Sequence, residues 1–316
     1  MNRPIALLIA ILLTCVSLTS VGLAAELGQL RFHLSAAPDG RLQLSLSDGG
    51  QRNGRSSSSF EVTDLQGLDR AALTGTPTNP IRFALVREAG RVDCAGSGGN
   101  RAAAGNCRFT GNAVFADLLA ARGIGRPSER QAFGLTMVGA SRTLVDALAA
   151  VRYPAPSIDD LTALAALDVT PAYIAELAAR GYRPARTSDL IAFKALGITP
   201  AYVDGLRRAG FGQLAAAEIV QFKALDISPA YLASLRSVGY GRLSASEVVQ
   251  LKALGVTADY IAGFQRLGYR NMPVGKLIES KALGVTPDDV RSLRGGRRVS
   301  ISADELIRLR IAGLLP

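Results

Sequence analysis

The sequence predicts an α+β protein of two domains, in which a small antiparallel β domain is followed by an α-solenoid of two-helix, 29-residue repeats. Apolar residues alternate between turn signals over about residues 26–110, which indicates strands. A short phrase then returns every 29 residues over 111–316, which is typical of stacked helical repeats. One pair of cysteines in the β region predicts a disulfide hairpin.

Residues 1–25 have the pattern of a secretory signal peptide. A single cation, Arg3, precedes a long apolar run that ends in small residues. We expect cleavage after Ala24 or Ala25, and therefore a periplasmic or secreted protein. The apolar run is nearly long enough to span a bilayer, so an uncleaved inner-membrane anchor is the main alternative.

Alternation of apolar and polar residues predicts the strands of the β domain. The segments "QLRFHLS" and "RLQLSLS" each place every second leucine or phenylalanine on one face, and "APDG" between them supplies a turn. They predict a hairpin with one buried face. A further run, "IRFALV", turns at "EAG" into "RVDCAG" and predicts a second hairpin.

The cysteines that remain after signal removal, Cys94 and Cys107, predict a disulfide in an oxidising compartment. If they face each other in an antiparallel hairpin, Val92 faces Phe109, which gives a consistent apolar face. The segment between them, "AGSGGNRAAAGN", is small and Gly-rich, so we expect a long hairpin loop there.

Few residues suited to catalysis are present. The chain has one histidine, His33, which the alternation points outward, and no cysteine outside the signal segment and the predicted disulfide. The chain therefore lacks the residues that Ser–His catalysis or a His-based metal site would need, and we predict no cofactor and no metal. "GSGGN" lacks the Gly-Lys-Ser/Thr of a phosphate-binding loop, and the serines of "GRSSSSF" are more typical of a polar edge or loop than of a nucleophile.

The repeat is the strongest signal in the chain. "KALGITPAYV" at residue 194 returns at 223, 252 and 281, "AALDVTPAYI" precedes it at 165, and the frame extends to about seven units. Each unit predicts two short helices. The first begins at an N-cap and ends at a glycine such as Gly181, and the second often begins with a capping box. The predicted N-caps of the first helices are Asn112, Ser141, Thr170, Thr199, Ser228, Thr257 and Thr286.

Two residue types recur in register with the repeat. All eight tyrosines fall at two repeat positions, which we interpret as packing between repeats rather than as a stacking surface for sugars or bases. The cations Lys194, Lys223, Lys252, Lys281 and Arg310, called the lysine ladder below, recur near the ends of the second helices. Acids recur near the starts of the same helices. Acids at helix starts and bases at helix ends both complement the helix dipole, so we favour this role for the ladder over the binding of a ligand.

The "KALGVTPxYIxxLRxxGY" unit resembles tandem repeats of exported bacterial proteins, which also occur at the C-termini of some BlaR1-like membrane metallopeptidases and anti-sigma-type membrane proteins. The segments "TDLQGLD", "RFALVREAGRVDCAG" and "FTGNAVFADLLAARG" resemble the region that precedes those repeats. The resemblance implies an extracytoplasmic sensing or interaction module. The chain has no His-Glu-x-x-His motif, so the peptidase activity is not carried over.

These patterns predict an exported, non-catalytic module that presents its solenoid to a protein partner in the cell envelope or senses the envelope. The alternative is binding of an acidic envelope polymer or lipid headgroups through the lysine ladder. An enzyme using the carboxylates of Asp159 with Asp160 or Asp288 with Asp289 is least favoured, because helix capping explains those pairs. The formal net charge of +10 suits nucleic acid, but export separates the chain from DNA. Membrane contact is expected only if the signal segment stays uncleaved.

Overall fold

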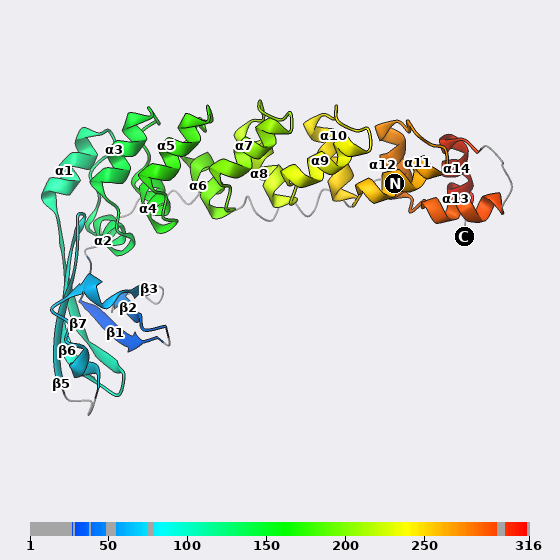
Figure 1. Cartoon of the computed structure of the whole chain (residues 1–316). Helices are drawn as coiled ribbons and strands as arrows, with labels where there is room; N and C mark the ends of the chain where they lie inside the picture. Colours follow the sequence, from blue (N-terminus) through cyan, green and yellow to red (C-terminus); the bar gives the residue numbers. More distant parts are fainter. Residues whose placement is uncertain are drawn as a thin grey trace. The chain divides into compact units, whose positions relative to one another are not determined.

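The computed structural model describes residues 27, 29–37, 39–48, 55–74, 79–295 and 301–314. Within them, a seven-stranded antiparallel sheet is followed by fourteen α-helices at regular spacing, which pack in i/i+2 pairs as a solenoid (Figure 1). The predicted fold class is confirmed. The predicted signal peptide lies outside the described residues. One compact unit holds the sheet together with Arg126–Met137, and the other holds Asp117–Gly125 and the chain from Val138 onward.

The sheet has the strand order β3-β2-β1-β7-β6-β5-β4. The two predicted hairpins are the β1–β2 and β5–β6 pairs, and the serine-rich segment forms an edge strand, β3. Two short 3₁₀ turns, Val62–Asp64 and Arg70–Leu73, lie between the strands. The strands are β1 Leu30–Ala36, β2 Leu42–Asp48, β3 Arg55–Phe60, β4 Leu65–Gln66, β5 Asn79–Arg87, β6 Gly90–Gly99 and β7 Ala102–Gly111.

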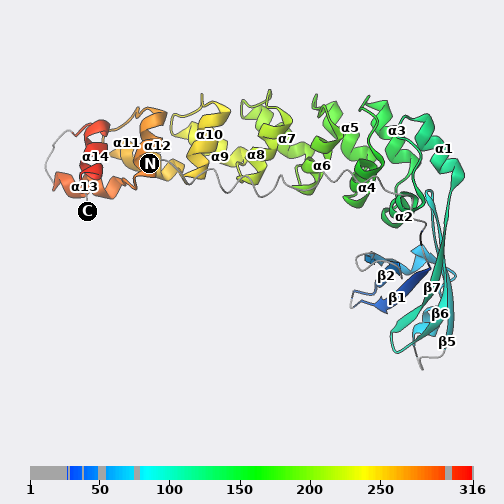
Figure 2. The same cartoon turned by 180° about the vertical axis from the view of Figure 1, so that it is seen from behind.

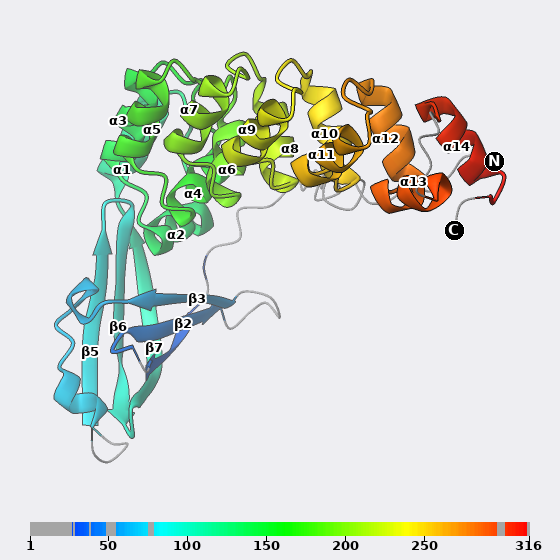
Figure 3. The same cartoon turned by 45° about the vertical axis from the view of Figure 1, so that its right-hand side comes forward.

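The sheet is strongly curled, so that its inner face makes its own core. Phe32 on β1 and Phe83 on β5 contact edge to face with ring centroids 5.1 Å apart. Two strands, β7 and β6, separate them in the sheet, and a flat sheet would hold their backbones about 14 Å apart. Figure 3 shows β1–β3 turned across the direction of β5–β7. The inward leucines of β1 and β2 fill the space inside this curl.

Two glycines permit the curl. Gly96 on β6 lies opposite Gly105 on β7, and Gly105 in turn lies opposite Phe32. A Cβ atom on Gly105 would lie 2.7 Å from the Phe32 ring, and one on Gly96 would lie 2.1 Å from the carbonyl oxygen of Ala104. The predicted long loop is therefore wrong, because β6 and β7 stay paired through the Gly-rich segment up to a tight turn at Asn100 and Arg101, both at positive φ.

The predicted disulfide register is confirmed. Cys94 pairs with Cys107 across β6 and β7, and Val92 lies opposite Phe109 on the same buried face. The two Cα atoms are 4.1 Å apart. A disulfide indicates an oxidising compartment, which agrees with the expected export.

Beside the sheet, α2 belongs to the same compact unit up to Met137. The Phe133 ring meets Phe109 of β7 edge to face with centroids 5.5 Å apart, and Ala132 and Met137 join the buried core of the sheet. The sequence pattern assigned this helix to the solenoid on its repeat spacing alone.

The solenoid alternates first and second helices along the chain. From α3 to α14 they follow one another in a single row, seen from the two opposite sides in Figure 1 and Figure 2. First helices stack on first helices and second on second, while α4 and α5, which are joined directly, meet at 94°. The first helices are α1 Ala113–Ala121, α3 Arg142–Ala150, α5 Pro171–Ala179, α7 Pro200–Arg208, α9 Pro229–Ser237, α11 Ala258–Arg266 and α13 Pro287–Arg294; the second are α2 Glu129–Val138, α4 Ile158–Ala166, α6 Thr187–Ala195, α8 Ala216–Ala224, α10 Ala245–Ala253, α12 Val274–Ala282 and α14 Ala303–Ile311.

Capping residues set the ends of these short helices. In six of the first helices, α3 to α13, the predicted Ser or Thr N-cap accepts a hydrogen bond from the backbone N–H three residues later, as Thr199 does from Tyr202. The predicted C-terminal glycines adopt a left-handed conformation, with φ of 76° at Gly181 and 96° at Gly239. Where Asp168 and Asp226 replace glycine after second helices, they adopt the same conformation, with φ of 53° and 54°.

Replacing both cysteines, as Cys94→Ala with Cys107→Ala, should lower the free energy of unfolding of the sheet by about 3 kcal/mol, because the bridge closes a short loop of the unfolded chain. Tyrosine fluorescence reports on the solenoid alone, since the chain has no tryptophan and all eight tyrosines lie between Tyr153 and Tyr269. In urea titrations, the unfolding midpoint of the sheet, followed by circular dichroism, should move to a lower urea concentration, while the midpoint followed by tyrosine fluorescence should stay the same. As a control, dithiothreitol should lower the midpoint of the sheet in the wild type and leave that of the variant unchanged. A wild-type midpoint that dithiothreitol does not change would contradict the prediction.

Candidate functional site

Each lysine of the ladder lies over a tyrosine in the first helix of its own repeat. The lysines come from the last turns of α6, α8, α10 and α12, and their Nζ atoms are 4.6–5.2 Å from the ring centroids. At this distance an ammonium group is attracted to the face of the ring. The pairs are Lys194 with Tyr173, Lys223 with Tyr202, Lys252 with Tyr231 and Lys281 with Tyr260.

The same tyrosines tie the two helices of a repeat together through their hydroxyl groups. Tyr173, Tyr202, Tyr231 and Tyr260 donate hydrogen bonds of 2.6–2.8 Å to the carbonyl oxygens of Ile198, Ile227, Val256 and Val285, which are the last residues before the N-cap of the next repeat. Burial raises the pKa of Tyr173, Tyr202 and Tyr231 to about 12, so these hydroxyls stay protonated donors at neutral pH. This set therefore packs within a repeat. Packing between repeats, as predicted, is found for Tyr240 and Tyr269 of the other set, whose hydroxyls donate to the carbonyl oxygens of Met272 and Ile301 in the following repeat.

The ladder also reaches the carbonyl ends of the neighbouring second helix. Lys194 Nζ donates to the carbonyl oxygen of Asp168 over 2.6 Å, and Arg310 donates to those of Leu283 and Gly284. Lys252 Nζ lies 3.6 Å from the carboxylate of Asp226. These cations therefore satisfy the orphan carbonyls of the helix before their own, which the helix dipole also favours.

Lysine and tyrosine occur together along the repeat. One repeat before Tyr173 and Lys194, the two positions hold Leu144 and Ala165. One repeat after Tyr260 and Lys281 they hold Asp289 and Arg310. The lysine is present in the units that carry the tyrosine and absent from those that do not. This joint occurrence is the signal in the sequence that could have predicted the contact. The tyrosines and the ladder lysines were interpreted separately, so the contact between them was not predicted.

A second row of inter-repeat bonds links the first helices. Arg236, Gln265 and Arg294 donate to the carbonyl oxygens of Ala209, Val238 and Leu267 in the preceding repeat, over 2.7–2.8 Å. In the last repeat, Arg294 and Arg310 together cap the C-terminal ends of both helices of the repeat before it. The cations of both rows are engaged within the solenoid.

Other arginines of the solenoid are free. Arg152, Arg183, Arg242, Arg266 and Arg270, called the arginine row below, are exposed and make no hydrogen bond or ion pair to the described residues. Each lies at the end of a first helix or in its connection to the next second helix. Because the repeats stack in register, these equivalent segments lie on one side of the solenoid.

Acids near this side are already occupied. Asp189 accepts a hydrogen bond from Arg186, Glu218 from the Ala215 backbone, and Glu247 from Ser244. The hydrogen bonds from Ser244 hold the pKa of Glu247 below its usual value. These carboxylates cap their own helices, so they neutralise helix ends rather than the arginine row.

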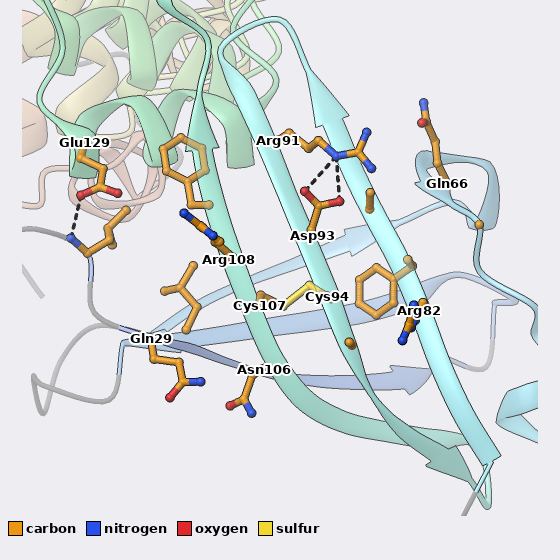
Figure 4. A pocket seen from close by; sticks show the side chains of 17 residues that line it. Gln29, Gln66, Arg82, Arg91, Asp93, Cys94, Asn106, Cys107, Arg108 and Glu129 are labelled. Carbon is orange, nitrogen blue, oxygen red and sulfur yellow. Dashed lines mark hydrogen bonds and ion pairs between the residues drawn. A yellow bond between two sulfur atoms is a disulfide. The ribbon is translucent and has the colours of Figure 1, made fainter.

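A second polar surface lies on the outer face of the sheet (Figure 4). A groove of about 860 Å³ runs over β4–β7 and is lined by Gln66, Arg82, Arg91, Asp93, Asn106 and Arg108 among others. Arg91 Nε donates to both carboxylate oxygens of Asp93, at 2.7 and 2.9 Å. At one end Glu129 accepts the backbone N–H of Leu27. Arg82 and Arg108 make no hydrogen bond or ion pair to the described residues.

The remaining candidates lie outside both surfaces. His33 is exposed on β1, as the alternation predicts. Asp159 with Asp160 and Asp288 with Asp289 lie in the first turns of α4 and α13. Among the described residues, no group of three or more His, Cys, Asp or Glu side chains is arranged to hold a metal ion.

With this geometry established, the chain was compared with known proteins. No family model matches it, and the search of curated proteins finds no significant match. In the described part of the chain no single helix is long and apolar enough to cross a membrane, although the bent pair α4 and α5 meets that test of length and composition.

Replacing Tyr231 by Phe should lower the free energy of unfolding of the solenoid by about 1 kcal/mol, because the carbonyl of Val256 loses its donor. Tyr182→Phe is the matched control. Its ring stacks on Phe193, but its hydroxyl has no hydrogen bond to the described residues, so the change should be nearly neutral. Urea titration followed by tyrosine fluorescence measures both. Equal losses in the two variants would contradict the role of the Tyr231 hydroxyl in joining the two helices of its repeat.

Proposed function

We propose that the protein is an exported, non-catalytic interaction module that binds an acidic partner in the cell envelope through the arginine row. The observation that carries the proposal is the contrast between the two sets of cations. The ladder lysines are half-buried over tyrosine rings, whereas Arg183, Arg242, Arg266 and Arg270 are exposed and free of ion pairs. Planar guanidinium groups suit bidentate contact with carboxylates and phosphates.

The arrangement of charge supports this assignment. Arg266 and Arg270 lie around the connection between α11 and α12, and the sequence has no acid between residues 264 and 277. Arg183 and Arg242 extend the positive side to the α5–α6 and α9–α10 connections. Several cations spread along one side of a solenoid are suited to an elongated acidic surface.

Export rests on two observations. The disulfide indicates an oxidising compartment, and the pattern of residues 1–25 is that of a signal peptide. The resemblance of the repeat to those of extracytoplasmic sensing proteins supports the same location.

A second candidate function is binding of acidic envelope polymer or lipid headgroups through the lysine ladder. In its favour, Lys223 and Lys281 have only their tyrosine ring as a polar neighbour among the described residues, and the ladder is in register along the second helices. Against it, a ligand would have to compete with the ring and with the carbonyl contacts of Lys194 and Arg310. We therefore rank it second.

Two charge-matched variants separate these functions. One carries Arg183→Gln, Arg242→Gln, Arg266→Gln and Arg270→Gln, and the other carries Lys194→Gln, Lys223→Gln, Lys252→Gln and Lys281→Gln. We expect affinity capture from envelope extract, with the disulfide intact, to lose its salt-sensitive partner with the arginine variant and to keep it with the lysine variant. The reverse pattern would favour the second function. Equal capture by both variants and the wild type would overturn the assignment to either row.

A further inference from the structure

We propose that the groove on the outer face of the sheet is a binding site for an acidic peptide that carries more than one carboxylate. This inference goes beyond the proposed function, because it concerns the sheet and not the solenoid. The site is centred on Ala95 of β6. The groove and its side chains are shown in Figure 4.

The strand register gathers cations around a small side chain. Ala95 lies opposite Arg82 on β5 and opposite Asn106 on β7. Asn106 lies opposite Arg31 on β1, which is exposed and free of ion pairs to the described residues. Side chains of directly opposite residues lie on the same face, so Arg82 and Arg31 flank a low floor formed by Ala95 and Asn106.

A third free guanidinium lies beside this floor. Arg108 is two residues from Asn106 on β7 and lies opposite Asp93. Both carboxylate oxygens of Asp93 accept hydrogen bonds from Arg91, so Asp93 is not available to neutralise Arg108. Ala84 on β5 lies opposite Asp93, is 4% exposed and continues the floor of small residues. The groove therefore has long cationic walls and a short apolar base.

The spacing of the cations indicates an extended ligand. Neighbouring strands are about 4.8 Å apart and residues along a strand about 3.3 Å apart, so the backbones of Arg82 and Arg108, two strands and two residues apart, are separated by about 12 Å along the sheet. One small anion does not reach across that span. An extended peptide rises about 3.3 Å per residue, so carboxylates three or four residues apart match it.

The uncharged groups of the groove favour a peptide over other polyanions. Gln66 and Asn106 carry side-chain amides, each able to donate to a peptide carbonyl and accept from a peptide N–H. Phe83 and Phe109 belong to the buried core and are not offered for stacking.

The disulfide lies directly under this site. Cys94 precedes Ala95, and Cys107 lies between Asn106 and Arg108, so the bridge fixes the two strands that carry the floor. Side chains held on paired, cross-linked strands are pre-organised for binding, which reduces the entropy cost of association.

The test uses a fluorescently labelled, N-acetylated hexaglutamate peptide and the full exported chain. The parent protein carries Arg→Gln substitutions at all five positions of the arginine row, so that this row does not contribute to the signal. By fluorescence anisotropy at low salt, Arg82→Gln and Arg108→Gln should each weaken binding roughly fivefold to tenfold, because each removes a charge-assisted contact to a carboxylate. Hexaglutamine should not bind.

Arg101→Gln is the matched control. Arg101 is exposed at the tip of the β6–β7 hairpin, outside the groove, and its charge change is identical. Affinity within twofold of the parent is expected. An equal loss from Arg101→Gln would mean that net charge alone attracts the peptide, and unchanged binding by Arg82→Gln and Arg108→Gln would overturn the site. Tighter binding of oligogalacturonate than of hexaglutamate would assign the groove to an acidic carbohydrate and overturn the peptide proposal. Because the solenoid row is already substituted, each of these outcomes is independent of the proposed function.

Discussion

The shortness of the solenoid helices is the constraint on which the second half of the chain depends. Helices such as α5 and α7 have nine residues, and helices of that length are marginal in water on their own. They persist because each repeat is closed by its neighbours. Leu190, Phe193 and Ile198 are at most 1% exposed between stacked helices, the Tyr173 hydroxyl bonds to the carbonyl at the end of its own repeat, and Lys194 bonds to a carbonyl of the preceding repeat.

This constraint divides the cations of the solenoid into two groups. The ladder residues and Arg236 or Arg294 lie where a repeat must satisfy the carbonyl ends of the previous one, so stacking already uses their charge. Arg183, Arg242, Arg266 and Arg270 lie where the chain crosses from a first helix to a second helix, and stacking does not use them. Unpaired guanidinium groups near the connections from first to second helices of several repeats leave a positive side that folding does not require. That surplus is the basis for assigning the binding role to the arginines.

Much of the fold could be predicted because its signals are local or strictly periodic. The N-caps, the C-terminal glycines and the Cys94–Cys107 register follow from residue types at fixed spacings. The Gly-rich hairpin was predicted wrongly, because Gly96 and Gly105 were interpreted as loop residues. They are needed where Phe32 packs over the strands, and that contact crosses the curled sheet. The groove was missed for the same reason, since Arg82 and Arg108 come together only through the strand register. The ladder was placed correctly, but its tyrosine contacts join the two helices of a repeat and are not visible within one helix.

The most direct test of this account is the free energy of unfolding of the two quadruple glutamine variants, measured by urea titration with tyrosine fluorescence. If the lysines hold the repeats together, the ladder variant should lose about 0.5–1 kcal/mol for each lysine. The arginine variant should stay within about 0.5 kcal/mol of the wild type for each substitution. A ladder variant as stable as the wild type, or an arginine variant that loses as much, would contradict the division of the cations into a structural set and a binding set.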